Sequence, residues 1–90
     1  MRNILLDTNA FLWWVTNYSK LSAEAKIIIS NPQNDIFFSI VSAWEIVIKA
    51  QICKLLLPET PDVYIPSRIA YYGFQILPIE MIDVSHILLL

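Results

Sequence analysis

Glycine, cysteine and histidine each occur only once in this chain of 90 residues, and each scarcity narrows the possible classes of protein. With so little glycine, turns must be built from proline, asparagine and aspartate. The lone Cys53 cannot form an internal disulfide. The first residues do not resemble a signal peptide, so the sequence predicts a protein of the reducing cytoplasm. No apolar run approaches the roughly 18–20 residues that span a bilayer, and we expect no membrane partner.

Charge is also scarce, and neither sign dominates. The net charge of −2 gives no bulk attraction to nucleic acid, so contact with RNA or DNA would need another means of neutralising phosphates.

Apolar residues, in contrast, are abundant. They make up 57% of the chain, against a usual share of about 45–50%. A single domain of residues 1–90 buries only about 60–65% of the surface that its unfolded chain exposes. The excess apolar surface indicates a partner, a self-association face or missing chain.

Strand-like and helix-like segments alternate along the sequence. Apolar runs predict strands over residues 3–6, 36–40 and 74–77. Three helices are expected in the first part of the chain. The first covers residues 10–15, the second follows an N-cap at Ser22 and ends near Asn31, and the third begins at Ser42. In the helix after Ser42 the apolar side consists of Trp44, Val47, Ile48 and Ile52, with Lys49 opposite. Pro61 and Pro66 each suit a first helical turn, with Gly73 as the stop, and residues 81–90 form a last amphipathic segment that carries His86.

This alternation predicts an α/β fold, in which helices flank a parallel sheet. In such sheets ligands bind outside the carboxyl ends of the strands. Asp7 directly follows the first strand, and Ser39, Ser42 and Glu45 follow the second. We therefore expect these residues to share one crevice.

Two carboxylates in one crevice favour a divalent cation between them. At a separation of about 5 Å and an effective dielectric constant of about 20, Coulomb's law gives about 3 kcal/mol of repulsion between them. Mg²⁺ or Mn²⁺ suits oxygen ligands, relieves this repulsion and commonly bridges to phosphates. Asp7 and Glu45 are the candidate ligands, and such an ion would also help to neutralise a nucleic acid.

Other interpretations of the same residues remain open. Asp7 can cap the next helix, and Ser42 with Glu45 fits a capping box, although one carboxylate oxygen can cap while the other meets a metal. Lys49 and Lys54 fit solvated charges at a helix end better than phosphate contacts. A phospho-acceptor role for Asp7 is disfavoured, because position 9 is asparagine rather than a second acid.

Three stretches together resemble the PIN-domain ribonucleases, in particular the VapC-type toxins of toxin–antitoxin pairs: LLDTNAFLWW, FFSIVSAWEIVIKAQICKLLLP and GFQILPI. The resemblance implies a three-layer PIN-like fold and Mg²⁺-dependent hydrolysis of RNA. Asp7 and Glu45 match the first two acids of the family's metal site. Ser42 matches the serine that supports them, and Thr8 and Asn9 match residues that orient the aspartate. A cognate antitoxin and a homodimer are the implied protein partners.

The sequence departs from the family pattern at two places. Cys53 stands where the family usually has a glycine before the Lys-Leu pair. The chain ends at Leu90, just before an Asp-Pro-Phe-Asp-like segment would supply the remaining acids, and Glu80 and Asp83 do not match that segment. The expectation is therefore a fold that is incomplete at its C-terminus, with weak or no ribonuclease activity. The alternative function is a non-catalytic remnant that acts by binding or dimerisation.

Overall fold

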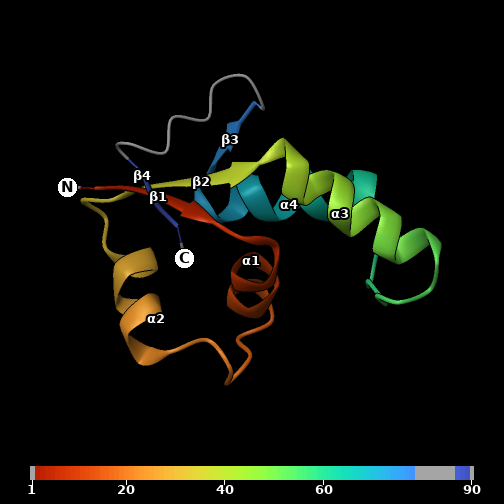
Figure 1. Ribbon diagram of the computed structural model, residues 1–90, viewed down its shortest axis with the longest axis horizontal. Helices are drawn as coiled ribbons and strands as arrows, with labels where there is room; N and C mark the ends of the chain where they lie inside the picture. Colours follow the sequence, from red (N-terminus) through yellow and green to blue (C-terminus); the bar gives the residue numbers. More distant parts are fainter. Residues whose placement is uncertain (1, 79–86, 90) are drawn as a thin grey trace.

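A parallel four-stranded sheet forms the centre of the molecule. The computed structural model describes residues 2–78 and 87–89, and its strands lie in the order β3-β2-β1-β4 (Figure 1). The strands are β1 (Asn3–Leu6), β2 (Asp35–Ser39), β3 (Gln75–Leu77) and β4 (Ile87–Leu89). Every pairing is parallel. The α/β class predicted from the sequence is confirmed, and the first three strands lie within one residue of their predicted bounds.

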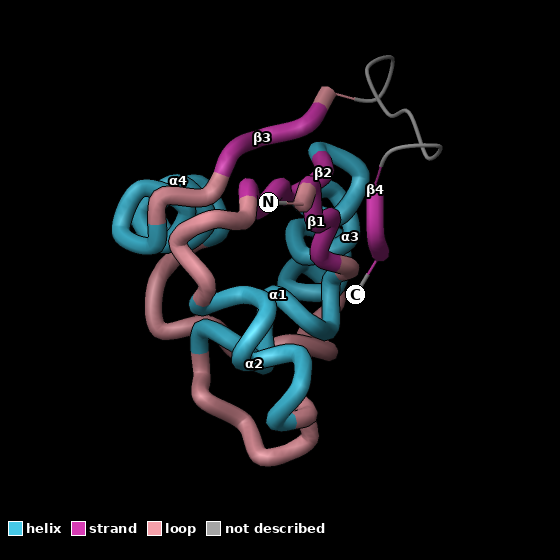
Figure 2. The backbone as a smooth tube through the Cα atoms, turned by 90° about the vertical axis from the view of Figure 1, so that its left-hand side faces the viewer, coloured by secondary structure: helices cyan, strands magenta, loops and turns pink. Residues whose placement is uncertain are grey.

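Four helices connect and cover these strands. They are α1 (Thr8–Val15), α2 (Ala23–Ser30), α3 (Ile40–Gln51) and α4 (Pro61–Tyr72). Helices α1 and α2 lie together on one side of the sheet, which both Figure 1 and Figure 2 show. Helix α3 continues away from the end of β2 with α4 alongside it, and α1 leaves the sheet at the same end as α3 (Figure 1). Within the described residues, no helix combines the length and the apolarity that crossing a membrane requires.

The core fixes α1 against the two central strands. Ile4 and Leu6 of β1 are fully buried, and so is Phe11 of α1. The rings of Phe11 and Phe38 lie 4.3 Å apart between centroids, which joins α1 to β2. Aromatic pairs at this distance add about 0.5–1.5 kcal/mol to the stabilisation from buried area. The start of α1 therefore has a defined position relative to the end of β2.

The predictions for α3 were wrong in two respects. The helix begins at Ile40, and its N-cap is Ser39, whose hydroxyl accepts a hydrogen bond from Val41 N at 3.1 Å. Ser42 thus lies in the first turn. The predicted buried side is also reversed, because Trp44 and Ile48 are 58% and 56% exposed, whereas Ile46 is fully buried. Apolar residues lie on both sides of this helix, so helical spacing alone could not show which side faces the core.

Two further predictions differ from the structure. Pro61 begins α4 as expected and Gly73 ends it with a φ of 71°, but Pro66 lies inside one continuous helix rather than in the first turn of a second. Residues 87–89 form a strand instead of the expected amphipathic segment, because this run of apolar residues pairs with the free edge of β1. The predictions for Glu80, Asp83 and His86 lie outside the described residues.

The end of α3 is a left-handed turn at Cys53, where φ is 59°. Lys54 N donates to Lys49 O at 2.9 Å, and Cys53 N donates to Ala50 O at 3.2 Å. This pair of bonds is the Schellman motif, whose left-handed position favours glycine because a Cβ atom is strained there. Glycine at position 53 would therefore fit this turn better than the cysteine that the chain has there.

We expect Cys53→Gly to stabilise the protein by about 0.5–1 kcal/mol. Relief of the left-handed strain returns about 1–2 kcal/mol, and the greater freedom of glycine in the unfolded chain offsets about 0.5–1 kcal/mol of it. Because Cys53 is exposed, its side chain contributes little packing. Urea denaturation measures the difference. Cys53→Ala, which keeps the Cβ atom, should leave the stability nearly unchanged, and an equal gain in both variants would contradict the strain.

Candidate metal centre

Asp7 is the N-cap of α1. Its Oδ1 accepts a hydrogen bond from Ala10 N at 2.7 Å, and its backbone has the extended conformation of a cap, with φ −76° and ψ 173°. The capping interpretation of Asp7 is therefore confirmed. The cap uses only one of the two carboxylate oxygens, and Asp7 is exposed. Capping consequently leaves Asp7 able to contact a ligand as well.

The register of the sheet brings the second candidate acid to the same region. Leu6 pairs with Phe38, so the chain leaves β1 at Asp7 directly beside the point where it leaves β2 at Ser39. The carboxyl ends of both strands thus open onto α1 and α3, as parallel pairing requires. The expectation of a shared crevice required the first two strands to be neighbours in the sheet, and they are.

Glu45 lies near the first residue of α1. The proximity of the Thr8 hydroxyl, a potential donor to the carboxylate, is the main reason that the pKa of Glu45 lies below its ordinary value of 4.5. Partial desolvation opposes this shift, and the positive charge of Lys49 adds to it. Thr8 itself is only 6% exposed, so its hydroxyl is held in place by the surrounding protein. The residue that follows Asp7 therefore lies near Glu45.

Lys49 is the second partner of Glu45. Its Nζ lies 3.6 Å from Glu45 Oε2, one helical turn further along α3. Both side chains are largely exposed, so this ion pair adds little stability. The capping box predicted for Ser42 and Glu45 is absent, because the helix begins at Ile40 and the Glu45 carboxylate lies near Thr8 and Lys49 instead.

The other predicted site residues lie in the same region but differ in surroundings. Ser42 is buried in the first turn of α3, one helical turn before Glu45. Asn9 is exposed in the first turn of α1 and lines a hollow together with Lys49. The proximity of Thr8 and Glu45 was not foreseen from the sequence, where no local pattern relates the two positions. It results from the register of β1 with β2.

The carboxylates of Asp7 and Glu45 suit a metal ion that prefers oxygen ligands and retains most of its coordinated water molecules. Among the residues that the structure describes, no cluster of three or more histidine, cysteine, aspartate or glutamate side chains forms a ready metal cage. Mg²⁺ is commonly bound through one or two carboxylates, with waters and substrate phosphates in the other positions. Asp7 and Glu45, which are both exposed, suit this kind of site better than a closed one.

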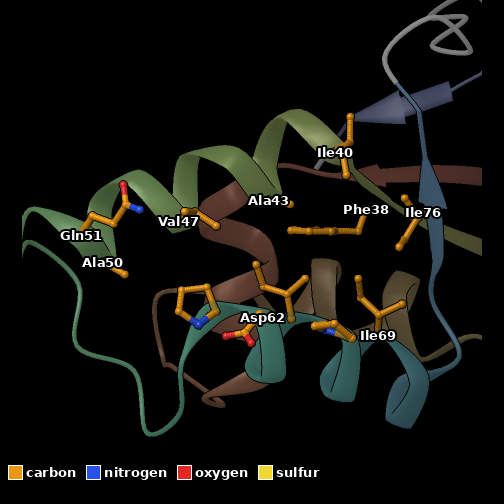
Figure 3. Close-up of a pocket in the computed structure, with 12 residues that line it drawn as sticks. Phe38, Ile40, Ala43, Val47, Ala50, Gln51, Asp62, Ile69 and Ile76 are labelled. Atoms are coloured by element: carbon orange, nitrogen blue, oxygen red, sulfur yellow. The ribbon is translucent and has the colours of Figure 1, made fainter.

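A separate apolar groove lies between α3 and α4, and it includes neither acid. It has a volume of about 540 Å³, and Phe38, Ala43, Val47 and Ile69 are among its lining residues (Figure 3). Phe38 projects between the two helices in this view. The groove contains few polar groups, so it suits an apolar side chain rather than a phosphate or a metal ion.

The fold agrees with the comparison to known families. Residues 4–89 match the PIN domain family, and the chain belongs to it. The sequence is similar to that of Ribonuclease VapC16 of Mycobacterium tuberculosis (strain ATCC 25618 / H37Rv), with 33% identity over 63 residues. That alignment covers 70% of this chain but only 45% of the relative, so the chain spans about half the length of the protein it matches. Comparison with solved structures gives no match.

We expect Thr8→Val to raise the pKa of Glu45 toward its ordinary value, because the variant removes the hydroxyl donor. The depressed pKa stabilises the folded protein above about pH 4.5, and this contribution disappears as the pH falls through the lower folded value. Thr8→Val should therefore be more destabilising at neutral pH than at pH 3. NMR titration of the Glu45 carboxylate with EDTA present measures the pKa. Thr8→Ser keeps the donor and should keep the low pKa, and a low pKa in Thr8→Val would contradict the assignment.

Proposed function

We propose that this PIN domain is a metal-dependent RNA endonuclease of the VapC type, with Asp7 and Glu45 holding a divalent ion. The observation that carries the proposal is the parallel register of β1 with β2, which places Asp7, at the end of β1, beside the end of β2, where the helix that carries Glu45 begins. Membership of the PIN family and the similarity to Ribonuclease VapC16 support the reaction class. Mg²⁺ is the proposed ion, and Mn²⁺ is an acceptable substitute because it also prefers oxygen ligands.

Each site residue has a role that follows from its surroundings. Asp7 is held by the bond from Ala10 N to its Oδ1, and its second oxygen would be available to hold the ion. Glu45 is ionised at neutral pH, as an ordinary glutamate is, and the nearby Thr8 hydroxyl lowers its pKa further, so the carboxylate is available to bind a cation. Ser42 supports the two acids, and Asn9 keeps the first turn of α1 polar. When bound, Mg²⁺ lowers the pKa of a coordinated water and stabilises negative charge on the phosphate.

The biological setting proposed for this activity is a toxin–antitoxin pair. A cognate antitoxin would bind the protein and restrain its attack on cellular RNA in the cytoplasm. The similarity to a VapC protein supports this setting. Because two carboxylates leave most positions of Mg²⁺ to water, we propose that the 90-residue chain alone cleaves RNA slowly.

We expect Asp7→Asn and Glu45→Gln each to lower Mg²⁺-dependent cleavage of single-stranded RNA by at least about 100-fold. Asparagine is as good an N-cap as aspartate, so the first variant removes the charge while it preserves the start of α1. Rates are measured on a labelled RNA with Mg²⁺ and with EDTA. Asp62→Asn, which changes an exposed acid on α4, is the matched control and should cleave normally. Full activity in Asp7→Asn, or activity in EDTA, would contradict the proposal.

The second candidate function is protein binding without catalysis, in particular formation of a homodimer. A row of exposed apolar side chains along α3 favours it, and we call this row the α3 stripe: Val41, Trp44, Ile48 and Ile52. Three of these residues are more than half exposed. Apolar area of this kind on a small domain is typical of an interaction surface. The two functions are compatible, because the stripe and Glu45 use different side chains of α3, and Asp7 lies at the start of α1.

If the α3 stripe forms a dimer, Ile48→Glu should produce a monomer. A charge placed in the centre of an apolar interface is left unpaired, which weakens association by several kcal/mol. Sedimentation velocity at several protein concentrations measures the mass. Ile27→Glu is the matched control, because Ile27 is an exposed isoleucine on α2 outside the stripe. A folded, monodisperse wild-type monomer would exclude the dimer, and equal dissociation by both variants would exclude the stripe as its surface.

A further inference from the structure

A hollow beside the two acids combines cations with apolar walls. Its volume is about 500 Å³, and Asn9, Trp13, Lys49 and Lys54 line it together with leucines that follow α3 and one leucine of α1. Among the described residues that line it, none is acidic, although the chain as a whole is negatively charged. We call it the lysine hollow.

The lysine hollow adjoins the candidate metal centre. Lys49 lines the hollow, and its Nζ also lies 3.6 Å from Glu45 Oε2. Asn9 lies in the first turn of α1, two residues after Asp7, and lines the hollow from the other helix. The hollow therefore shares Lys49 with the partner set of Glu45 and lies close in the chain to Asp7.

The turn at Cys53 brings the second cation into place. The bond from Lys54 N to Lys49 O reverses the chain at the end of α3, so that the two lysines line the same hollow. Lys54 has an exposed side chain, and within the described residues no hydrogen bond or ion pair holds it. An ammonium group of this kind can move toward an anion at little cost, because it gives up no existing partner.

The walls of the hollow suit a nucleobase. Trp13 is half-buried, and its ring packs edge to face against Tyr18 at 6.0 Å, which fixes its orientation. Leu55 and Leu57 continue the apolar wall beside it. Bases of single-stranded RNA are recognised by stacking on aromatic rings, while basic side chains hold the phosphates. The hollow combines positively charged side chains, which suit the phosphate, with apolar side chains, which suit the base.

A neighbouring hollow shows why basic residues alone are not enough. It contains Arg68, but Arg68 Nη1 donates to Glu59 Oε1 at 2.6 Å and to Ser67 Oγ at 2.9 Å. That guanidinium group is already paired with a carboxylate, so an incoming phosphate would have to compete with it. Of the two hollows, the lysine hollow is therefore the better site for an anion.

We propose that the lysine hollow binds one nucleotide of single-stranded RNA next to the cleaved position, with its phosphate on Lys49 and Lys54 and its base against Trp13. This inference rests on the proposed ribonuclease function and adds to it the place where the RNA is held. Lys54 gives the cleaner test, because Lys49 is also the partner of Glu45.

The test measures how tightly a short labelled single-stranded RNA binds to the 90-residue chain in EDTA. Fluorescence anisotropy gives the affinity at several salt concentrations. Lys54→Gln should weaken binding and reduce the slope of log affinity against log salt concentration by about 0.7. Trp13→Leu should lower affinity about tenfold through lost stacking, with little change of slope. Lys26→Gln, which changes a lysine of α2 outside the hollow, is the matched control and should bind as the wild type does.

The outcomes separate this inference from the function on which it rests. RNA binding that is equally strong in Lys54→Gln and Lys26→Gln would overturn the lysine hollow as a subsite and leave the ribonuclease proposal intact. Failure of the wild type to bind RNA at any salt concentration would overturn the lysine hollow, whereas the ribonuclease proposal would be overturned only by the absence of Mg²⁺-dependent cleavage. If an acidic peptide bound with the same dependence on Lys54 while RNA did not, the hollow would be a protein contact and the inference would be wrong.

Discussion

The parallel pairing of β1 with β2 is the constraint on which the rest of the structure depends. Because Leu6 lies opposite Phe38, the chain leaves both strands at the same edge of the sheet, and α1 and α3 begin side by side there. Packing of Phe11 on Phe38 holds this arrangement. A shift of one residue in the register would turn every buried side chain of β1 to the other face. It would also separate Thr8 from Glu45, and the candidate metal centre would be lost.

Much of the fold could be predicted because its signals are local. The strand at residues 3–6 is a continuous apolar run, Ser22 is an N-cap, and Gly73 ends a helix with a positive φ. Each of these features is decided by the conformational preference of a few neighbouring residues. The start of α3 was missed because Ser39 and Ser42 both suit an N-cap, and the sequence alone does not rank them. Its buried side was missed because apolar residues lie on both sides of the helix.

The candidate site was predictable in outline but not in its contacts. The position of Asp7 follows from a general rule, since ligands of parallel sheets collect at the carboxyl ends of the strands. The proximity of Thr8 to Glu45 could not be foreseen, because it depends on how two distant segments meet in space. The same is true of the lysine hollow, in which Lys49 and Lys54 gain their relevance from the turn at Cys53 and from the neighbouring helix α1.

Joint binding of one divalent ion by Asp7 and Glu45 is the central claim, and paramagnetic NMR tests it most directly. Mn²⁺ added in small amounts to the labelled protein broadens the resonances of nuclei close to the ion. The account predicts that the amides of Thr8 and Asn9 broaden together with the side chain of Glu45 at the lowest Mn²⁺ concentrations, and that excess Mg²⁺ reverses the effect. Broadening confined to one of the two acids, or centred on Asp35 or Asp62 instead, would contradict it.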